Sequence, residues 1–230
     1  MSLKRRMKRA AELGRSGPPP PRLAYGHEIV FTPIREAWHD ALPPAAKATI
    51  PRLHRVITER REDLRSAIAE LEGLVECHPQ APIFYNFLNI AYGLTGQGEK
   101  SRALVVRCRA ALPDYLFGTI AQAELLLDDE EYHALRDLWG GRFDLRELYP
   151  DRTCFHVSEF AGFYAIVGLY HHETGNHAEA RRLSQMLMDV APNEAATKSL
   201  YGRMYRDTIE ELLEVFDPEN IARLAALDPP

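Results

Sequence analysis

Apolar side chains recur at helical spacing along most of the chain after residue 50. In residues 51–76 they are separated by three, four or seven positions, which places them on one face of an α-helix. These positions are Leu53, Val56, Ile57, Leu64, Ile68, Leu71, Leu74 and Val75. The pattern predicts one long helix from Pro51, which suits a first helical position, to about Glu76, or two shorter helices in the same range.

Proline, glycine and capping residues divide the rest of the chain into shorter helical segments. Predicted helices cover residues 82–94, 99–112, 116–127, 130–139, 158–173 and 178–190, followed by one capped by Asn193 and a short one after Asp217. Asp128 or Asp129 is predicted to cap the fourth of these helices, and Ser158 the fifth. Only residues 28–32 are consistent with a short strand or an extended peptide, so the predicted fold class is all-α, with paired antiparallel helices.

Three prolines, Pro79, Pro113 and Pro192, each close one of the predicted helices, and the first two are 34 residues apart. A helix–turn–helix unit of 34 residues is the period of the tetratricopeptide repeat (TPR). In residues 82–115 the pattern is carried by Tyr85, Leu88, Tyr92, Gly96, Ser101, Val105, Cys108 and Pro113. In residues 161–194 it is carried by Tyr164, Val167, Gly168, Gly175, Asn176, Ala180, Pro192 and Asn193.

Over residues 60–216 the chain therefore resembles the TPR family, with two good and about two degenerate repeats. The positions that depart from the pattern are Asn89, where Gly or Ala is usual, and His171, Ser184 and Leu187. The middle unit, residues 116–160, has about eleven residues more than the period allows, and we place them at 140–155. The resemblance implies a solenoid of stacked helix pairs, in which Gly168 and Ala180 let neighbouring backbones approach.

The resemblance also implies a concave groove lined by the first helix of each pair. The groove positions are Ile83, Asn86, Ile90, Gly93 and Leu94 in the first good repeat, with Tyr85 as a further contact, and Gly162, Ala165, Leu169 and His172 in the second. These side chains are mostly apolar and lack the Lys, Asn and Arg clamp with which TPR co-chaperones hold a terminal carboxylate.

The apolar groove has three candidate occupants. A helix or an extended segment of another protein is the first of them. The second is the chain's own segment 25–38, which contains Ile29, Val30, Phe31, Ile34 and Trp38. In the third case the groove is too closed to bind anything. Removing the chain up to Pro44 distinguishes these cases. If segment 25–38 fills the groove, its removal exposes the apolar surface and the protein loses solubility.

Charge is distributed unevenly along the 230 residues, which carry a net charge of −5. Residues 1–22 hold seven basic side chains against Glu12, a net charge of +6, which leaves −11 for the remainder. The basic residues are Lys4, Arg5, Arg6, Lys8, Arg9, Arg15 and Arg22. This arm is expected to bind nucleic acid, a membrane surface or an acidic protein, to fold back on the acidic body, or to remain a solvated tail. The nucleic-acid alternative has no interleaved aromatic residues to support base stacking.

Three parts are expected along the chain. Residues 1–22 form the basic arm and a polyproline linker, because Pro18–Pro21 is typical of a stiff spacer. Residues 23–50 form an extended or irregular segment, and residues 51–230 form the TPR-like helical domain. The longest apolar stretch, Phe160–Tyr170, is about half the length of a membrane span.

Candidate catalytic and metal-ligating residues are few. His172 and His177 are five positions apart with Gly175 between them, unlike the H-E-x-x-H pattern that places two ligands on one helix face. Cys77-His78 and the pair Cys154 and His156 would form a metal site only if the fold joined them. No glycine-rich phosphate loop and no G-x-S-x-G motif is present. We therefore expect no catalysis, no metal and no cofactor.

Cysteine usage and composition complete the expectation. Three widely spaced cysteines fit a reducing cytoplasm, and frequent Ala, Arg, Leu and Pro are typical of bacterial proteins. The predicted function is a cytoplasmic adaptor or scaffold that binds a segment of another protein in the groove. The alternative is a subunit of a larger assembly whose residues Lys4–Arg9 contact nucleic acid or another anionic surface.

Overall fold

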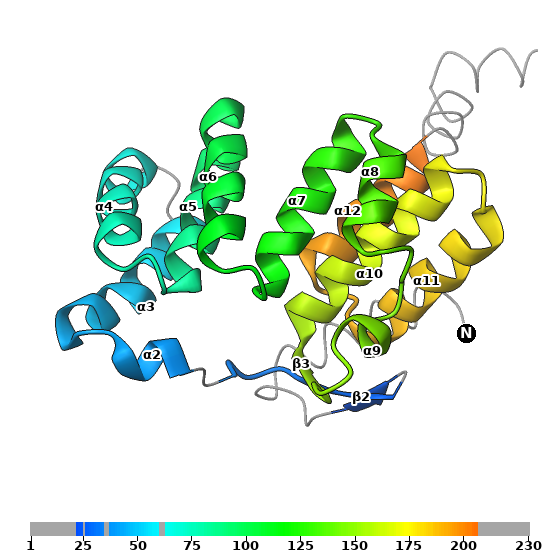
Figure 1. Cartoon of the computed structure of the whole chain (residues 1–230), viewed down its shortest axis with the longest axis horizontal. Coiled ribbons are helices and arrows are strands. Elements are labelled where there is room, and N and C mark those ends of the chain that lie inside the picture. The colour runs from blue at the N-terminus through cyan, green and yellow to red at the C-terminus, as the bar shows by residue number, and fades with distance from the viewer. Residues whose placement is uncertain (1–21, 25, 35–36, 60–62, 207–230) are drawn as a thin grey trace, which may run out of the picture. The chain divides into compact units, whose positions relative to one another are not determined.

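The computed structural model describes residues 22–24, 26–34, 37–59 and 63–206, and this part of the chain is mostly helical (Figure 1). It divides into two compact units. The larger unit comprises residues 20–159, and the described residues of the smaller unit are 160–206. The arm residues Lys4, Arg5, Arg6, Lys8 and Arg9, the Pro18–Pro21 spacer and the helix predicted after Asp217 lie outside the described residues.

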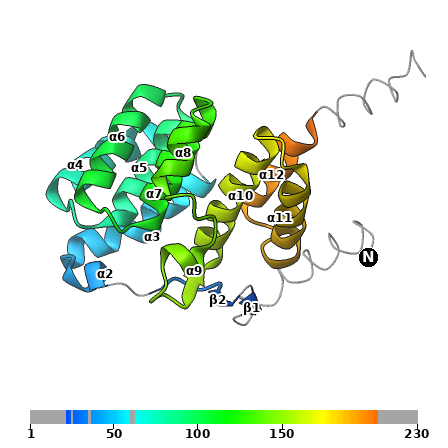
Figure 2. The ribbon, with the colours of Figure 1, turned by 45° about the vertical axis from the view of Figure 1, so that its right-hand side comes forward.

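Helices joined by short turns make up most of the larger unit. They are α2 (Ala37–Ala41), α3 (Pro44–Glu59), α4 (Leu64–Cys77), α5 (Pro82–Leu94), α6 (Gly98–Ala111), α7 (Leu116–Asp128), α8 (Tyr132–Leu138) and α9 (Leu145–Leu148). From α3 to α8 each helix packs against the next, and α3 also contacts α5 (Figures 1 and 2). Neighbours in sequence are thus neighbours in space, as in the predicted paired helices.

The predicted boundaries hold best in the middle of this series. The helix expected at 82–94 is confirmed as α5, and α6 and α7 begin and end within a residue of their predicted limits. Residues 51–76 form two helices rather than one long helix. The prediction that Pro51 begins a helix is wrong, because α3 begins at Pro44 and contains Pro51.

Packing explains how α3 continues through a proline. Pro51 is exposed, so its ring lies on the solvent side of α3. On the opposite face, Ala46 precedes the proline and Leu53 follows it, and both are buried. Burial of one apolar stripe on both sides of Pro51 therefore outweighs the local preference for a helix start.

Two capping predictions in the larger unit are wrong as well. Glu131 precedes α8, and no cap bond from its side chain is present, because α7 runs on to Asp128 and Glu130 then turns the chain with a φ of 59°. Asp129 instead accepts two hydrogen bonds from Arg102 of α6, at 2.6 and 2.7 Å. The other error concerns Ser158, because the helix that it was predicted to cap already begins at Val157 and contains Ser158.

A small sheet joins distant parts of the larger unit. Strand β1 (Arg22–Ala24) runs antiparallel to β2 (His27–Val30), and β2 runs parallel to β3 (Cys154–His156) (Figures 1 and 2). Ile29 lies opposite Phe155 in the register, and both side chains are fully buried. The short strand expected at 28–32 is confirmed in β2, whereas the pattern did not reveal β1 or β3.

The segment 25–38 is therefore divided between two environments. Ile29 packs within the sheet, and Trp38 is half-buried against the core of α3–α6. The extra residues expected at 140–155 form α9, a turn and most of β3, and they bury Leu145 and Phe155 completely.

Helix α10 (Val157–Glu173) leads into the smaller unit, which continues with α11 (His177–Val190) and α12 (Ala195–Met204). A Cβ added to Gly168 of α10 would lie 3.1 Å from both δ carbons of Leu200, so the Leu200 side chain fills the space that this small residue leaves, and the predicted approach of backbones stays a prediction. The predicted cap at Asn193 is wrong by one residue, because Glu194 precedes α12.

No helix in the described part of the chain has the length and apolar character needed to cross a bilayer.

Candidate functional site

One face of α5 carries the first half of the predicted groove. Ile83, Asn86, Ile90 and Leu94 follow one another at spacings of three and four, so they form one stripe along the helix. Ile90 is 41% and Leu94 39% exposed, while Ile83 and Asn86 are half-buried. The opposite face of α5, with Phe84 and six others, is buried. The helix therefore has one side in the core and a second apolar side in contact with solvent.

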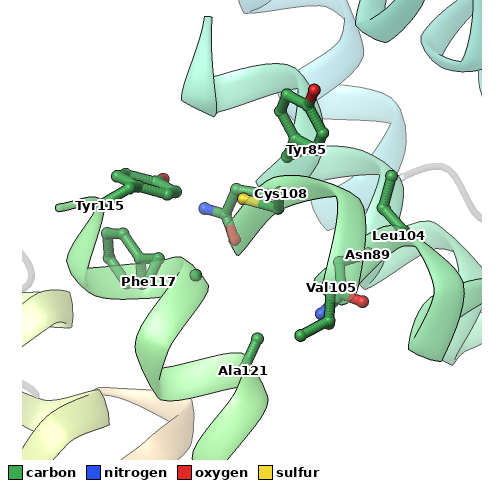
Figure 3. Close-up of a pocket in the computed structure, with 10 residues that line it drawn as sticks. Tyr85, Asn89, Leu104, Val105, Cys108, Tyr115, Phe117 and Ala121 are labelled. Carbon is green, nitrogen blue, oxygen red and sulfur yellow. The ribbon is translucent and has the colours of Figure 1, made fainter. Parts of the chain in front are cut away.

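A crevice borders this stripe where α5, α6 and α7 meet (Figure 3). Its walls are Tyr85, Asn86, Asn89, Leu104, Val105, Cys108, Tyr115, Phe117, Gly118 and Ala121. The space measures about 280 Å³, which includes space open to solvent. The crevice is thus wide enough for the tip of a side chain and too shallow to enclose a small molecule. The predicted contacts Tyr85 and Asn86 both lie in it.

Two asparagine amides supply the polar character of the crevice. Oδ1 of Asn89 accepts a hydrogen bond of 2.6 Å from the Ser101 hydroxyl, which ties α5 to α6. This bond gives a physical reason for a polar residue where the repeat pattern has a small one. The Asn86 amide makes no hydrogen bond to any residue that the structure describes, and it is only half-buried. It is therefore free to donate to and accept from a bound group.

Cys108 and Tyr85 are two further polar side chains in the crevice. Burial raises the pKa of the Cys108 thiol to about 11, so the sulfur is protonated at neutral pH and is a poor nucleophile. Burial likewise raises the pKa of Tyr85. Figure 3 shows the Tyr85 hydroxyl directed away from Cys108. The crevice therefore offers apolar contact and amide hydrogen bonds, and these are binding functions.

The second half of the predicted groove lies on α10. Ala165 and Leu169 are each 3% exposed, and His172 is half-buried. The His172 ring lies edge-on to that of His177, with centroids 5.3 Å apart. Because α5 and α10 belong to different compact units, each half is a separate surface here, and their union into one groove stays a prediction.

Metal-ligating residues do not converge in the part of the chain that the structure describes. There, no group of three or more His, Cys, Asp or Glu side chains is arranged to hold a metal ion. Cys77 is exposed at the end of α4, and Cys154 lies in β3. Near His177, the Asn176 amide lies 3.4 Å from Nδ1 of His171, an ordinary turn contact.

A polar cluster that the sequence did not reveal surrounds the start of α10. Glu159 is 6% exposed and forms an ion pair with Arg152, and it also accepts a 2.9 Å hydrogen bond from the backbone N–H of His156. Nδ1 of His156 lies 2.6 Å from the Ser158 hydroxyl and accepts a longer bond from the Ser158 N–H. Burial lowers the pKa of His156, although the nearby Glu159 opposes this.

A serine hydroxyl beside a neutral histidine is also the arrangement of a nucleophile and its base. Here these groups cap a helix. The carboxylate of Glu159, the third residue of α10, accepts a hydrogen bond from the backbone N–H of His156, which precedes the helix. That reciprocal pattern is a capping box with His156 as the cap. In the sequence, this capping box is visible only as the spacing His156-x-x-Glu159. Histidine is not one of the usual cap residues, which are Ser, Thr, Asp and Asn, so the sequence pattern did not predict it.

Comparison of the chain with protein-family models, with curated proteins and with solved structures gives no match. The structure alone defines the class, which is a mostly helical protein of sequential helix pairs with a small sheet. The TPR resemblance stays a prediction that rests on the residues named above.

Proposed function

We propose that this protein is a non-catalytic adaptor of TPR-like architecture that binds a segment of another protein along α5. The observation that carries the proposal is the stripe of Ile90 and Leu94 beside the unbonded amide of Asn86. Large apolar side chains that are well exposed and adjacent on one helix mark interaction surfaces in soluble proteins. The amide next to them supplies the polar contact that fixes a partner's register.

The architecture in this proposal rests on the repeat and on the order of packing. Residues 82–115 form a helix pair, α5 and α6, with a turn at Gly96, and the next helix packs on α6. A single pair exposes one apolar face, and stacking of pairs covers it. The stripe on α5 is then a face that stacking leaves accessible.

The exposed areas limit how strongly this surface binds. Ile90 and Leu94 are each about two-fifths exposed, so complete burial contributes about 1 kcal/mol per side chain. Two such contacts and one amide hydrogen bond give weak binding after the loss of translational freedom. The partner must therefore contact more of the molecule than this stripe.

The test is an affinity pull-down from a lysate of the source organism with matched variants. Ile90→Asp/Leu94→Asp places two charges on the stripe, and Val106→Asp places one on an exposed position of α6 (70% exposed). We expect a stoichiometric protein partner on the unmodified chain and on the Val106 variant, but not on the double variant. Thermal unfolding by circular dichroism shows that all three are folded. Equal recovery on the two charged variants contradicts the proposal.

The alternative function is favoured by one observation, the net charge of +6 in residues 1–22 against −11 elsewhere. In this case the protein is a subunit whose residues Lys4–Arg9 contact nucleic acid or another anionic surface. Deletion of residues 1–22 would abolish such binding, and rising salt would weaken it steeply because the release of counterions becomes less favourable as the salt concentration rises. Binding through the α5 stripe would tolerate both changes.

A further inference from the structure

The three-stranded sheet connects two segments that are far apart in the sequence. Residues 22–30 supply β1 and β2, and residues 154–156 supply β3. The Glu28 N–H donates a 2.8 Å hydrogen bond to the carbonyl of Thr153, and Ile29 and Phe155 are fully buried opposite one another. The N-terminal segment is thus held to the turn before α10 by very short strands.

A buried histidine lies in this sheet. His27 is 1% exposed, and neither ring nitrogen has a hydrogen-bond partner among the described residues. Its ring packs edge-on against Phe155, with centroids 4.9 Å apart. The charged groups that face it from the described residues are Asp144 and Arg146, at the start of α9. Nε2 of His27 lies 3.9 Å from Asp144 Oδ1, too far for a hydrogen bond.

The two charged neighbours of His27 act in opposite directions on its pKa, with Asp144 raising it more than Arg146 lowers it. Arg146 donates to both carboxylate oxygens of Asp144, and its backbone N–H donates to Oδ1 at 2.9 Å. This pairing holds the pKa of Asp144 below its ordinary value. A proton on His27 would therefore be favoured by a carboxylate that is already bonded to Arg146, and disfavoured by that guanidinium and by burial, which has the largest effect.

The neighbouring strand ends in a second histidine of similar character. Nδ1 of His156 accepts a 3.3 Å hydrogen bond from the Ser158 N–H, which requires an unprotonated nitrogen, and it lies 2.6 Å from the Ser158 hydroxyl. A proton at this nitrogen removes the bond from the Ser158 N–H, and with it the side-chain cap of α10. The charged group facing His156 is Glu159, which is already paired with Arg152, while β2 presents the apolar Val30 opposite.

We propose that the β1–β2–β3 sheet is an acid-released clasp. It holds residues 22–30 against residues 153–156 when His27 and His156 are neutral, and it opens when they gain protons. Opening exposes Ile29 and Phe155 to solvent and frees the N-terminal segment from the turn before α10.

The direction of the pH effect on the sheet follows from the direction in which the pKa values of the two histidines are shifted. Burial lowers the pKa of His27 and of His156, so the open form binds protons more tightly than the closed form. The sheet is therefore most stable above about pH 6.5, the ordinary value for histidine, and loses stability as the pH falls below it. In each case burial is the largest cause, and a nearby carboxylate opposes it.

The test measures amide hydrogen exchange of the full chain at about pH 7.5 and about pH 5, corrected for the intrinsic rates. We expect opening of residues 28–30 and 154–156 to increase on the order of tenfold for each pH unit by which the pKa of His27 lies below its ordinary value. Helix α5 should show no such change. A direct titration of the His27 ring by NMR gives that pKa without any substitution.

Matched variants separate the clasp from general acid sensitivity. His27→Phe fills the site with a ring that does not titrate, and His156→Asn keeps a capping acceptor. The double variant should keep its protection at low pH, while His54→Gln, at an exposed histidine of α3, should respond like the unmodified chain. Equal protection of the unmodified sheet at both pH values overturns the proposal. So does a His27 pKa at or above the ordinary value.

Discussion

The helix pair α5–α6 and the helix pair α7–α8 make the same turn with different residues. In both, the second residue after the C-cap donates its N–H to a carbonyl in the last turn, Gln97 to Tyr92 at 2.9 Å and Glu131 to Leu126 at 2.8 Å. The residue in the left-handed conformation is Gly96 in the first pair and Glu130 in the second, with φ of 68° and 59°. Packing thus imposes on Glu130 a conformation that its side chain disfavours.

The two pairs also differ in how they build their core. Helix α6 has 14 residues and buries Leu104, Val105 and Cys108, whereas α8 has seven residues and buries only Leu135. Burial in the second pair comes partly from the residues that follow it, because Trp139 is 2% exposed and Leu145 fully buried. A short helix is therefore tolerated where an insertion completes the core.

The largest expected effect tests this difference in packing. Phe84→Ala in α5 removes a fully buried ring and should lower the free energy of unfolding by about 3–5 kcal/mol. Leu135→Ala in α8 should lower it by about 2–5 kcal/mol, because the insertion makes this site equally buried. Urea unfolding followed by circular dichroism gives both values, and Val106→Ala is the exposed control. A Leu135 variant as stable as the control would show that α8 lies outside the core.

The next effect concerns the polar contact between α5 and α6. Asn89→Ala and Ser101→Ala each remove one partner of the 2.6 Å bond between α5 and α6, and each should lower stability by about 1 kcal/mol. The double variant carries small residues at both positions, as the repeat pattern has them, and should lose little more than either single variant. A double-mutant cycle measures this coupling. Strict additivity would mean that the bond does not join the helices.

Exchanging the turn residues should have opposite effects in the two pairs. Glu130→Gly relieves the left-handed glutamate and should raise the unfolding free energy by about 0.5–1 kcal/mol. Gly96→Ala introduces the same strain into the other pair and should lower it by a similar amount. The urea midpoints of the two variants measure these effects. A change of stability in the same direction in both variants would contradict the explanation by left-handed strain.

The smallest effect belongs to the ion pair that joins the two helix pairs. Arg102 holds the pKa of Asp129 below its ordinary value, so the contribution of the pair is present at neutral pH and is lost as the pH falls through that lowered value. Asp129→Asn should lower the melting temperature slightly at low salt. At about 0.5 M salt the difference should vanish, because both groups are exposed and screened. A difference that persists at high salt would point to another role for Asp129.

Local signals determined how well the sequence predicted each element. In α5 every signal agrees, with Pro82 at the start and Gly96 after the end, and the boundaries are correct. In α8 the preceding acidic residues suggested an early cap, but the extra length of α7 and the turn at Glu130 moved the start to Tyr132. Strands β1 and β3 have three residues each, which is too short for a periodic signal.

The candidate site shows the same limits. The spacing of Asn86 and Ile90 on α5 was sufficient to place them on one stripe, and exposure of Ile90 follows because the opposite face enters the core. Helix α10 is apolar on nearly all sides, so its periodicity does not distinguish a groove face from a buried one. Ala165 and Leu169 are accordingly buried. The hydrogen bond of Asn89 depends on the approach of α6, which no local pattern contains.

The pairing of β2 with β3 has a consequence for the order in which the chain acquires its structure. The helix pairs need only contacts between near neighbours, whereas Ile29 and Phe155 meet across most of the larger unit's sequence. Loop closure makes such distant contacts slow to form. At about 5–20 residues per second, the ribosome completes β3 about 6–25 s after β2 has been synthesised. Throughout that interval Ile29 can pair only with β1 and lacks β3 and Phe155, so a nascent chain arrested before residue 154 should present this segment to chaperones.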